Sequence, residues 1–160
     1  MAFTINITNR QQVHNLLLQL RSETQPLWGA FTAQHMVEHL VEQVEYTNGK
    51  KIGTCDRSPE DAQRSKQIGV YTDAPIPRNI VLDPPPVGFR YPDLATAITR
   101  LMQELSDFDI YFQNPAATSI HGGFGPMTGP EWRIWHSKHF THHFRQFGLL
   151  EEPVNELPAT

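Results

Sequence analysis

The chain of 160 residues is poor in cysteine, in basic clusters and in long apolar runs. Its single cysteine, Cys55, excludes an internal disulfide and a metal site built from several thiolates. A net charge of −4 without a run of lysine or arginine argues against a nucleic-acid-binding surface. No apolar stretch approaches the roughly 18 residues of a membrane span, and the first residues lack a secretory signal pattern. We therefore expect a cytoplasmic protein that binds neither nucleic acid nor membrane.

The glycine-containing stretch at residues 119–127, SIHGGFGPM, also lacks what a nucleotide site needs. It has neither the lysine nor the strand–loop–helix context of a phosphate-binding loop. We expect a loop here rather than a nucleotide site. Internal repeats and long heptad runs are absent as well, so a solenoid and a coiled coil are not predicted.

The composition is that of one globular domain, with 39% hydrophobic and 19% charged residues. We place this domain at residues 1–150, which is long enough to bury a proper core. The last ten residues, 151–160, are acidic and contain two prolines. We expect this tail to be partly ordered at most.

Half of the eight histidines stand between residues 128 and 148, in TGPEWRIWHSKHFTHHFRQFG. Thr128 and Glu131 have the spacing of a capping box, and Pro130 falls in the first turn, where its missing N–H costs nothing. Gly148 is a typical residue for ending a helix. The segment therefore predicts one well-delimited helix that carries four histidines.

The helical periodicity of this segment places several histidines on the face expected to meet the core. The residues on that face are Trp132, Trp135, His136, His139, Phe140, His143 and Phe147. The residues on the opposite, polar face are Ser137, Lys138, Thr141 and Arg145. Burying several unpaired imidazoles together is costly, so their nitrogens require partners.

A divalent metal is one such partner, because His139 and His143 are one helical turn apart on the same face. Bonds to the backbone, to carboxylates or to water are the alternative. His136 shares the same face one turn earlier, which makes it the main rival as a metal ligand. A histidine from another helix would complete a three-histidine set.

Three further helices are predicted from capping residues and apolar spacing. The first begins after Thr8 and ends before Pro26. The second begins after Thr32 and ends at Gly49, with His39 at the edge of its apolar face. The third runs from Pro92 to Asn114. Its predicted core positions, at three-four spacing, are Leu94, Ile98, Leu101, Leu105, Phe108 and Phe112.

Residues 48–91 connect the second and third of these helices. Only a short helix is expected at Ser58, and six of the thirteen prolines lie between residues 75 and 92. A connection of this length can return the chain to the end from which it started, so the two helices that it joins can run parallel. The predicted fold class is therefore all-α, a four-helix bundle with a long proline-rich crossover between helices two and three.

Three segments of the chain resemble the DinB-like superfamily of four-helix-bundle metalloenzymes, specifically a branch of uncharacterised function. They are residues 28–40 (WGAFTAQHMVEHL), residues 88–114 more loosely, and above all residues 121–150 (HGGFGPMTGPEWRIWHSKHFTHHFRQFGLL). Together they cover somewhat under half of the chain. The extra histidines and the long proline-rich crossover depart from the family pattern.

The resemblance implies a divalent metal, Zn, Ni or Fe, bound by one histidine of the second helix and two of the last. In this sequence these ligands are His39 in VEHL and His139 with His143 in HFTHHFRQ. Members of the superfamily with known activities carry out transfer or isomerisation with low-molecular-weight thiols. The resemblance therefore implies a small-molecule substrate and a thiol as a candidate partner.

Three imidazoles leave coordination positions open on a metal, as in catalytic sites. We therefore expect a metal-dependent enzyme, of the hydrolase or the transferase and isomerase type, in which the metal activates water or a small thiol. Glu42 and His121 are the candidates for proton transfer or for orienting the metal ligands. A solvated helix face for Glu42 and a turn-stabilising role for His121 are the alternatives. The competing hypothesis is a non-catalytic metal- or ligand-binding bundle, either a monomer or a homodimer.

Overall fold

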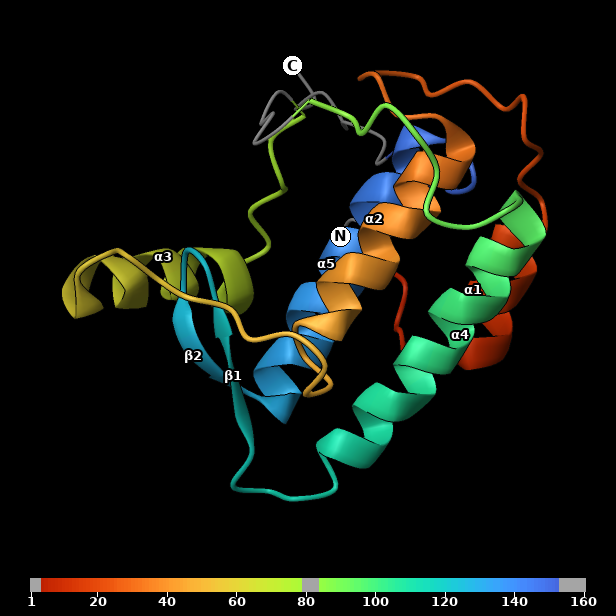
Figure 1. The fold of residues 1–160 in the computed structure, drawn as a ribbon. Coiled ribbons are helices and arrows are strands. Elements are labelled where there is room, and N and C mark those ends of the chain that lie inside the picture. Colours follow the sequence, from red (N-terminus) through yellow and green to blue (C-terminus); the bar gives the residue numbers. More distant parts are fainter. Residues whose placement is uncertain (1–3, 79–83, 153–160) are drawn as a thin grey trace, which may run out of the picture.

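The computed structural model describes residues 4–78 and 84–152, which form a mostly helical fold with one small sheet (Figure 1). The expectation of a mainly helical chain is thereby confirmed. The elements are α1 (Arg10–Leu17), α2 (Ala33–Glu45), α3 (Pro59–Tyr71), α4 (Leu94–Tyr111), β1 (Thr118–His121), β2 (Gly125–Thr128) and α5 (Gly129–Gln146).

The helices begin at side chains that accept hydrogen bonds from otherwise unpaired backbone N–H groups. Thr32 accepts from the N–H of His35 at 3.1 Å at the start of α2. Thr128 and Glu131 form the expected capping box of α5. Asn9, rather than Thr8, caps α1. The sequence thus located these starts to within about two residues, the usual uncertainty of helix ends.

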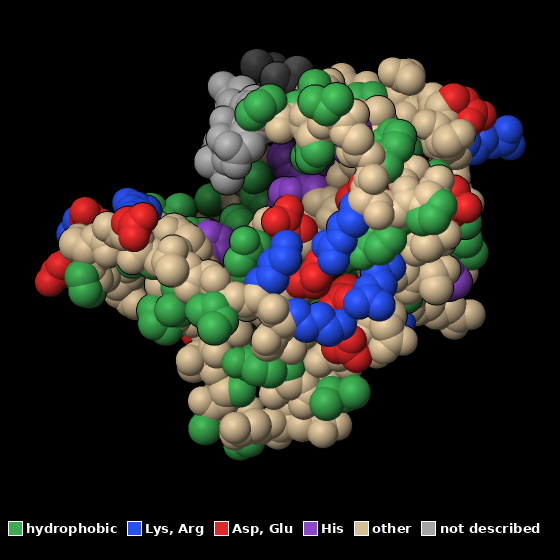
Figure 2. Space-filling view, in the orientation of Figure 1, with side chains coloured by type: hydrophobic (Ala, Val, Ile, Leu, Met, Phe, Trp, Pro, Cys, Tyr) green, Lys and Arg blue, Asp and Glu red, His purple; other side chains and the backbone are tan. Residues whose placement is uncertain are grey.

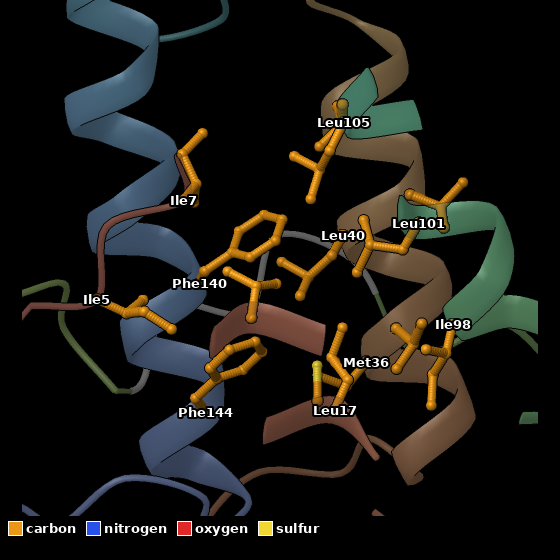
Figure 3. Packing of buried hydrophobic residues seen from close by; sticks show 14 of the residues in the cluster. Ile5, Ile7, Leu17, Met36, Leu40, Ile98, Leu101, Leu105, Phe140 and Phe144 are labelled. Carbon is orange, nitrogen blue, oxygen red and sulfur yellow. The ribbon is translucent and has the colours of Figure 1, made fainter. Parts of the chain in front are cut away.

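The core lies between α1, α2, α4 and α5 (Figures 1 and 3). Figure 1 shows α2 and α4 running in one direction and α5 in the other, so the crossover joins parallel helices. In Figure 3, Phe140 and Phe144 of α5 extend toward Leu40 of α2 and Leu17 of α1, and all four are fully buried. Membership of the four-helix-bundle class stays a prediction, which we consider with the function.

The crossover contains a longer helix than the sequence suggested. α3 has 13 residues, starts at the Ser58 cap and carries two acidic residues in its first turn. Of its residues, only Ala62 and Val70 are buried, which leaves a weak apolar stripe. That weak stripe explains why the sequence predicted only a short helix here. α3 lies beside the hairpin and α5, and Tyr71 anchors it by donating a hydrogen bond to Glu131 at 2.7 Å.

The expectation of a purely helical chain was wrong at residues 118–128. This stretch, predicted as a loop, is an antiparallel hairpin that pairs Thr118 with Thr128 and His121 with Gly125. Gly125 has a φ of 73°, a conformation that glycine adopts without a steric cost. The hairpin is held against α5 because the indole N–H of Trp132 donates to the carbonyl of Ser119 at 3.1 Å.

The polar face predicted for α5 is also partly buried, because the N-terminal segment covers it. Ser137 Oγ accepts from the backbone N–H of Ile7 at 3.1 Å, and Thr141 Oγ1 accepts from that of Ile5 at 2.9 Å. Ile5 and Ile7 are themselves fully buried against α5. Two small hydroxyl side chains thus serve as docking points for the N-terminal segment, and α5 is covered on two sides.

Among the described helices, none has both the length and the apolar character needed to cross a membrane. Of the acidic tail expected at 151–160, residues 153–160 lie outside the described part of the chain.

We predict that Leu105→Ala lowers the free energy of unfolding by about 2 to 5 kcal/mol, because Leu105 is fully buried in α4. Ile110→Ala in the same helix is the matched control, since Ile110 is 63% exposed. Its change should stay within about 0.5 kcal/mol. Denaturant unfolding measures both values, and equal losses would contradict the assignment of the buried face.

Candidate metal centre

Three histidine side chains converge where α2 and α5 cross the core. The Nε2 atom of His139 lies 3.2 Å from Nε2 of His39 and 3.0 Å from Nε2 of His143. One ligand atom from each of the three lies within 4.8 Å of the others. These are the three residues that the sequence and the family resemblance indicated.

This spacing fits a metal ion. A tetrahedral ion with metal–nitrogen bonds of about 2.0–2.1 Å separates two ligand nitrogens by about 3.3 Å. The observed separations of 3.0 and 3.2 Å are close to that value. Three imidazoles that turn the same ring nitrogen toward one point have the donor set of a catalytic zinc-type site.

The cluster is positioned by helix geometry on one side and by helix packing on the other. His139 and His143 occupy successive turns of α5, so their side chains lie one above the other. His39 comes from α2, which packs against α5. Phe31, just before α2, covers the rings of His39 and His143 at centroid distances of 5.3 and 5.8 Å.

Gln146 fixes the orientation of His143. Its side-chain oxygen lies 2.7 Å from Nδ1 of His143, and its amide nitrogen donates to the carbonyl of Trp28 at 3.1 Å. Because the amide nitrogen is the donor to Trp28, the amide oxygen faces the imidazole and Nδ1 carries the proton. The lone pair of Nε2 on His143 is therefore directed at the cluster, as required of a metal ligand.

The turn that receives Gln146 requires a glycine. Gly29 has a φ of 81°, and a Cβ at this position would come within 2.8 Å of the Gln146 amide nitrogen. The N–H of Leu27 also donates to the backbone carbonyl of Gln146 at 2.7 Å. Residues 27–29 thus hold the end of α5 in place through hydrogen bonds to the backbone and the side chain of Gln146.

Burial keeps the three imidazoles neutral. Desolvation lowers the pKa of His39 to about 4, against a smaller opposing effect of the Glu42 charge. Desolvation and the neighbouring His39 lower the pKa of His143 to about 3. The pKa of His139 is also well below 6.5, first through desolvation and then through His143 and His39. At neutral pH all three therefore have a free lone pair for a metal.

Glu38 and Glu45 of α2 are committed to other partners. Glu38, next to His39 in sequence, accepts from the backbone N–H groups of Arg90 at 2.6 Å and Tyr91 at 3.3 Å. Glu45 pairs with Arg90. Within the described residues, the only group of three or more potential metal ligands is the histidine cluster, without a carboxylate. A metal held by these three histidines would therefore have no carboxylate ligand from the described residues.

The site lies near the surface. His39 and His139 are half-buried, and His143 is buried. Figure 2 shows histidine side chains at the bottom of a hollow on one face, next to a patch where positive and negative side chains alternate.

The two candidates for proton transfer occupy different places. Glu42 lies one turn after His39 on α2, half-exposed and 3.2 Å from the ammonium group of Lys51. His121 lies in the hairpin, where its Nδ1 accepts from the N–H groups of Gly123 and Phe124 at 3.0 and 3.2 Å. This arrangement favours the turn-stabilising role for His121 over direct proton transfer.

His121 nevertheless approaches the cluster through an aromatic contact. Its ring meets the ring of Trp135 at 5.1 Å, and Trp135 stacks on His139 at 6.1 Å. Burial lowers the pKa of His121 to about 4. His121 is therefore a neutral residue that helps to hold Trp135 in place.

His136, the rival ligand, is turned away from the cluster. It is almost completely buried, and its Nε2 lies 3.0 Å from Oγ1 of Thr47. Because that hydroxyl donates to the carbonyl of Val44 at 2.8 Å, it accepts a hydrogen bond from His136. His136 is thus a core histidine bonded to Thr47, two residues after the end of α2.

Sequence reasoning missed the residues that orient and cover the ligands: Gln146, Phe31 and the carbonyl of Trp28. Gln146 follows His143 by three residues, a spacing that places the two side chains on one helix face. That spacing was the available signal for Gln146. The contact with residue 28 spans more than a hundred positions, and local periodicity carries no information about it.

Comparison of the chain with protein-family models, with curated proteins and with solved structures gave no match.

We predict that replacing His39, His139 or His143 by alanine lowers the affinity for Zn²⁺, while the helical circular dichroism stays largely intact. His142→Ala is the matched control, because His142 lies in α5 beside His143 but outside the cluster. Competition with a chromophoric chelator measures the affinity. A triple alanine variant that retains one metal per chain would contradict the ligand assignment.

A second prediction concerns pH. Protons compete with the metal only when the ligands can bind them, and the pKa values of His39 and His143 are about 4 and about 3. The affinity for Zn²⁺, corrected for the chelator, should therefore change little between about pH 7 and 5 and fall as the pH passes through about 4. A steep loss that begins near pH 6.5, the value for ordinary imidazoles, would contradict the burial of the ligands.

Proposed function

We propose that this protein is a metal-dependent enzyme of the DinB-like four-helix-bundle type, acting on a small molecule. The metal is a divalent ion, Zn, Ni or Fe, held by His39, His139 and His143. The reaction is a hydrolysis, or a transfer or isomerisation with a low-molecular-weight thiol. The helical core between α1, α2, α4 and α5 and the crossover joining parallel helices support the bundle assignment.

One observation carries the proposal: three neutral imidazoles converge on one point, and the described residues offer no fourth protein ligand there. A structural metal site is normally closed by four protein ligands, whereas a catalytic site keeps a position open. When bound, a divalent ion at such a site lowers the pKa of a coordinated water or thiol toward neutrality.

The surrounding residues have separable roles in this proposal. Gln146 holds the proton on Nδ1 of His143 and so keeps the ligand lone pair in position. Phe31 and Trp135 cover the imidazole rings and limit the access of bulk water. We assign proton transfer to Glu42, whose charge already acts on His39 and whose half-exposed carboxylate is accessible to solvent. His121 acts through its contact with Trp135.

The experiment is a set of assays on metal-loaded protein with ester and amide substrates, and with small electrophiles in the presence of low-molecular-weight thiols. We expect activity that disappears on chelation and returns on addition of metal. His143→Ala should abolish it, and Glu42→Gln should lower kcat with less effect on KM.

His142→Ala is again the control and should retain most of the activity. Activity that survives both chelation and His143→Ala would contradict metal activation. If broad panels show no turnover and the bound metal has four protein ligands, the non-catalytic metal-binding bundle is the correct function.

A further inference from the structure

A cavity of about 330 Å³ lies between α3, the hairpin, α5 and the proline-containing segment that follows α3. Its volume is at the lower end of the range for small-molecule binding sites. It is separate from the point on which the three imidazoles converge. The residues that line it are Ser65, Ile68, Gly69, Ala74, Pro75, Ile76, Pro77, Phe124, Trp135 and Lys138.

The walls of this cavity are mostly apolar, and two of the side chains that form them are aromatic. Phe124 from the hairpin meets Trp135 from α5 edge to face, with centroids 4.9 Å apart and planes at 88°. Gly69 allows α3 to approach, since a Cβ there would come within 2.3 Å of Cζ of Phe124. The glycine therefore maintains a close contact at the cavity wall, and the aromatic rings present a surface suited to an apolar body.

Among the described residues that line the cavity, Lys138 is the one that carries a charge. Its ammonium group donates to the carbonyls of Gly69 at 2.7 Å and Thr72 at 3.1 Å. An ammonium has three donors, so two neutral carbonyls leave one unused. Within the described residues, no carboxylate forms a direct ion pair with Lys138, although Asp73 is near enough to oppose the effect of burial on its pKa. The cavity thus combines apolar walls with an ammonium group that has one donor left and no direct ion pair among the described residues.

Trp135 connects this cavity to the histidine cluster. Its ring lines the cavity and also stacks on His139 at 6.1 Å. A molecule held against Trp135 in the cavity would therefore touch a ring that itself contacts His139. The charge and the apolar surface of the cavity, in turn, restrict what that molecule can be.

We propose that this cavity binds a small organic anion with an apolar body, such as an aryl or branched alkyl carboxylate, with Lys138 bound to the anionic group. The claim that such an anion is the substrate rests on the proposed enzymatic function. The claim that it binds depends only on the cavity. An apolar body gains about 25 cal/mol for each Å² that it buries, and the charged hydrogen bond selects the anion over a neutral analogue.

The test compares two probes of similar shape, 4-phenylbutyrate and its neutral amide, 4-phenylbutyramide, on protein freed of metal by chelation. Removing the metal prevents the carboxylate from binding to it. Titration followed by NMR should show the carboxylate binding at least about tenfold more tightly than the amide, equivalent to about 1.4 kcal/mol. The methyl signals of Ile68 and Ile76 should shift, whereas those of the exposed Ile110 on α4 should not.

Variants then assign the selectivity. Lys138→Met should bring the two probes to equal affinity, and Lys138→Arg should retain the preference for the carboxylate. Arg64→Met is the control, because Arg64 is an exposed cation of α3 outside the lining. Equal binding of both probes to the unmodified protein, no binding of either, or a carboxylate preference that Lys138→Met leaves unchanged would overturn the inference.

The comparison of probes on the unmodified protein does not depend on the folding of any variant. It also separates the two proposals. Anion binding to metal-free protein without any later catalytic activity would leave the cavity assignment intact and refute the enzymatic function. Metal-dependent activity without anion binding would support the enzymatic function and refute the cavity assignment.

Discussion

The crowding of three imidazoles in a poorly solvated place is the constraint on which this structure depends. Their nitrogens lie 3.0 and 3.2 Å apart, so protonating any one of them would place positive charge beside two other rings. Desolvation opposes that charge and holds all three rings neutral. A divalent ion satisfies the lone pairs of all three together.

The rest of the fold serves to keep α5 in place relative to α2. The capping box fixes where α5 begins, and the turn at residues 27–29 holds its last residues through Gln146. The N-terminal segment covers one side of α5 through Ser137 and Thr141. On another side the hairpin and α3 enclose the cavity lined by Trp135, whose ring also stacks on His139. Secondary structure outside the four core helices therefore contributes to the site as much as to the core.

Sequence reasoning was strongest where a single helix repeats a pattern. It located α5, its cap and the pair His139 and His143, because these depend on spacing within one element. His39 needed the family resemblance, since its partner lies 100 residues away. The hairpin was missed because each of its strands has only four residues, too few for a clear alternation. The length of α3 was underestimated because its buried stripe is narrow. Ser137 and Thr141 were predicted to lie on a polar face, because local periodicity carries no information about the distant N-terminal segment that covers them.

X-ray absorption spectroscopy of the metal-reconstituted protein tests the central claim most directly, because it identifies the atoms around the ion. With Zn²⁺ bound, we predict three imidazole nitrogens at about 2.0–2.1 Å. In addition, there should be at least one oxygen or nitrogen ligand from outside the protein that exchanges with an added anion such as azide. The signal of the three imidazoles should decrease in a His39→Ala variant. A shell without imidazole scattering, or one filled by protein ligands that azide does not alter, would contradict the open three-histidine centre.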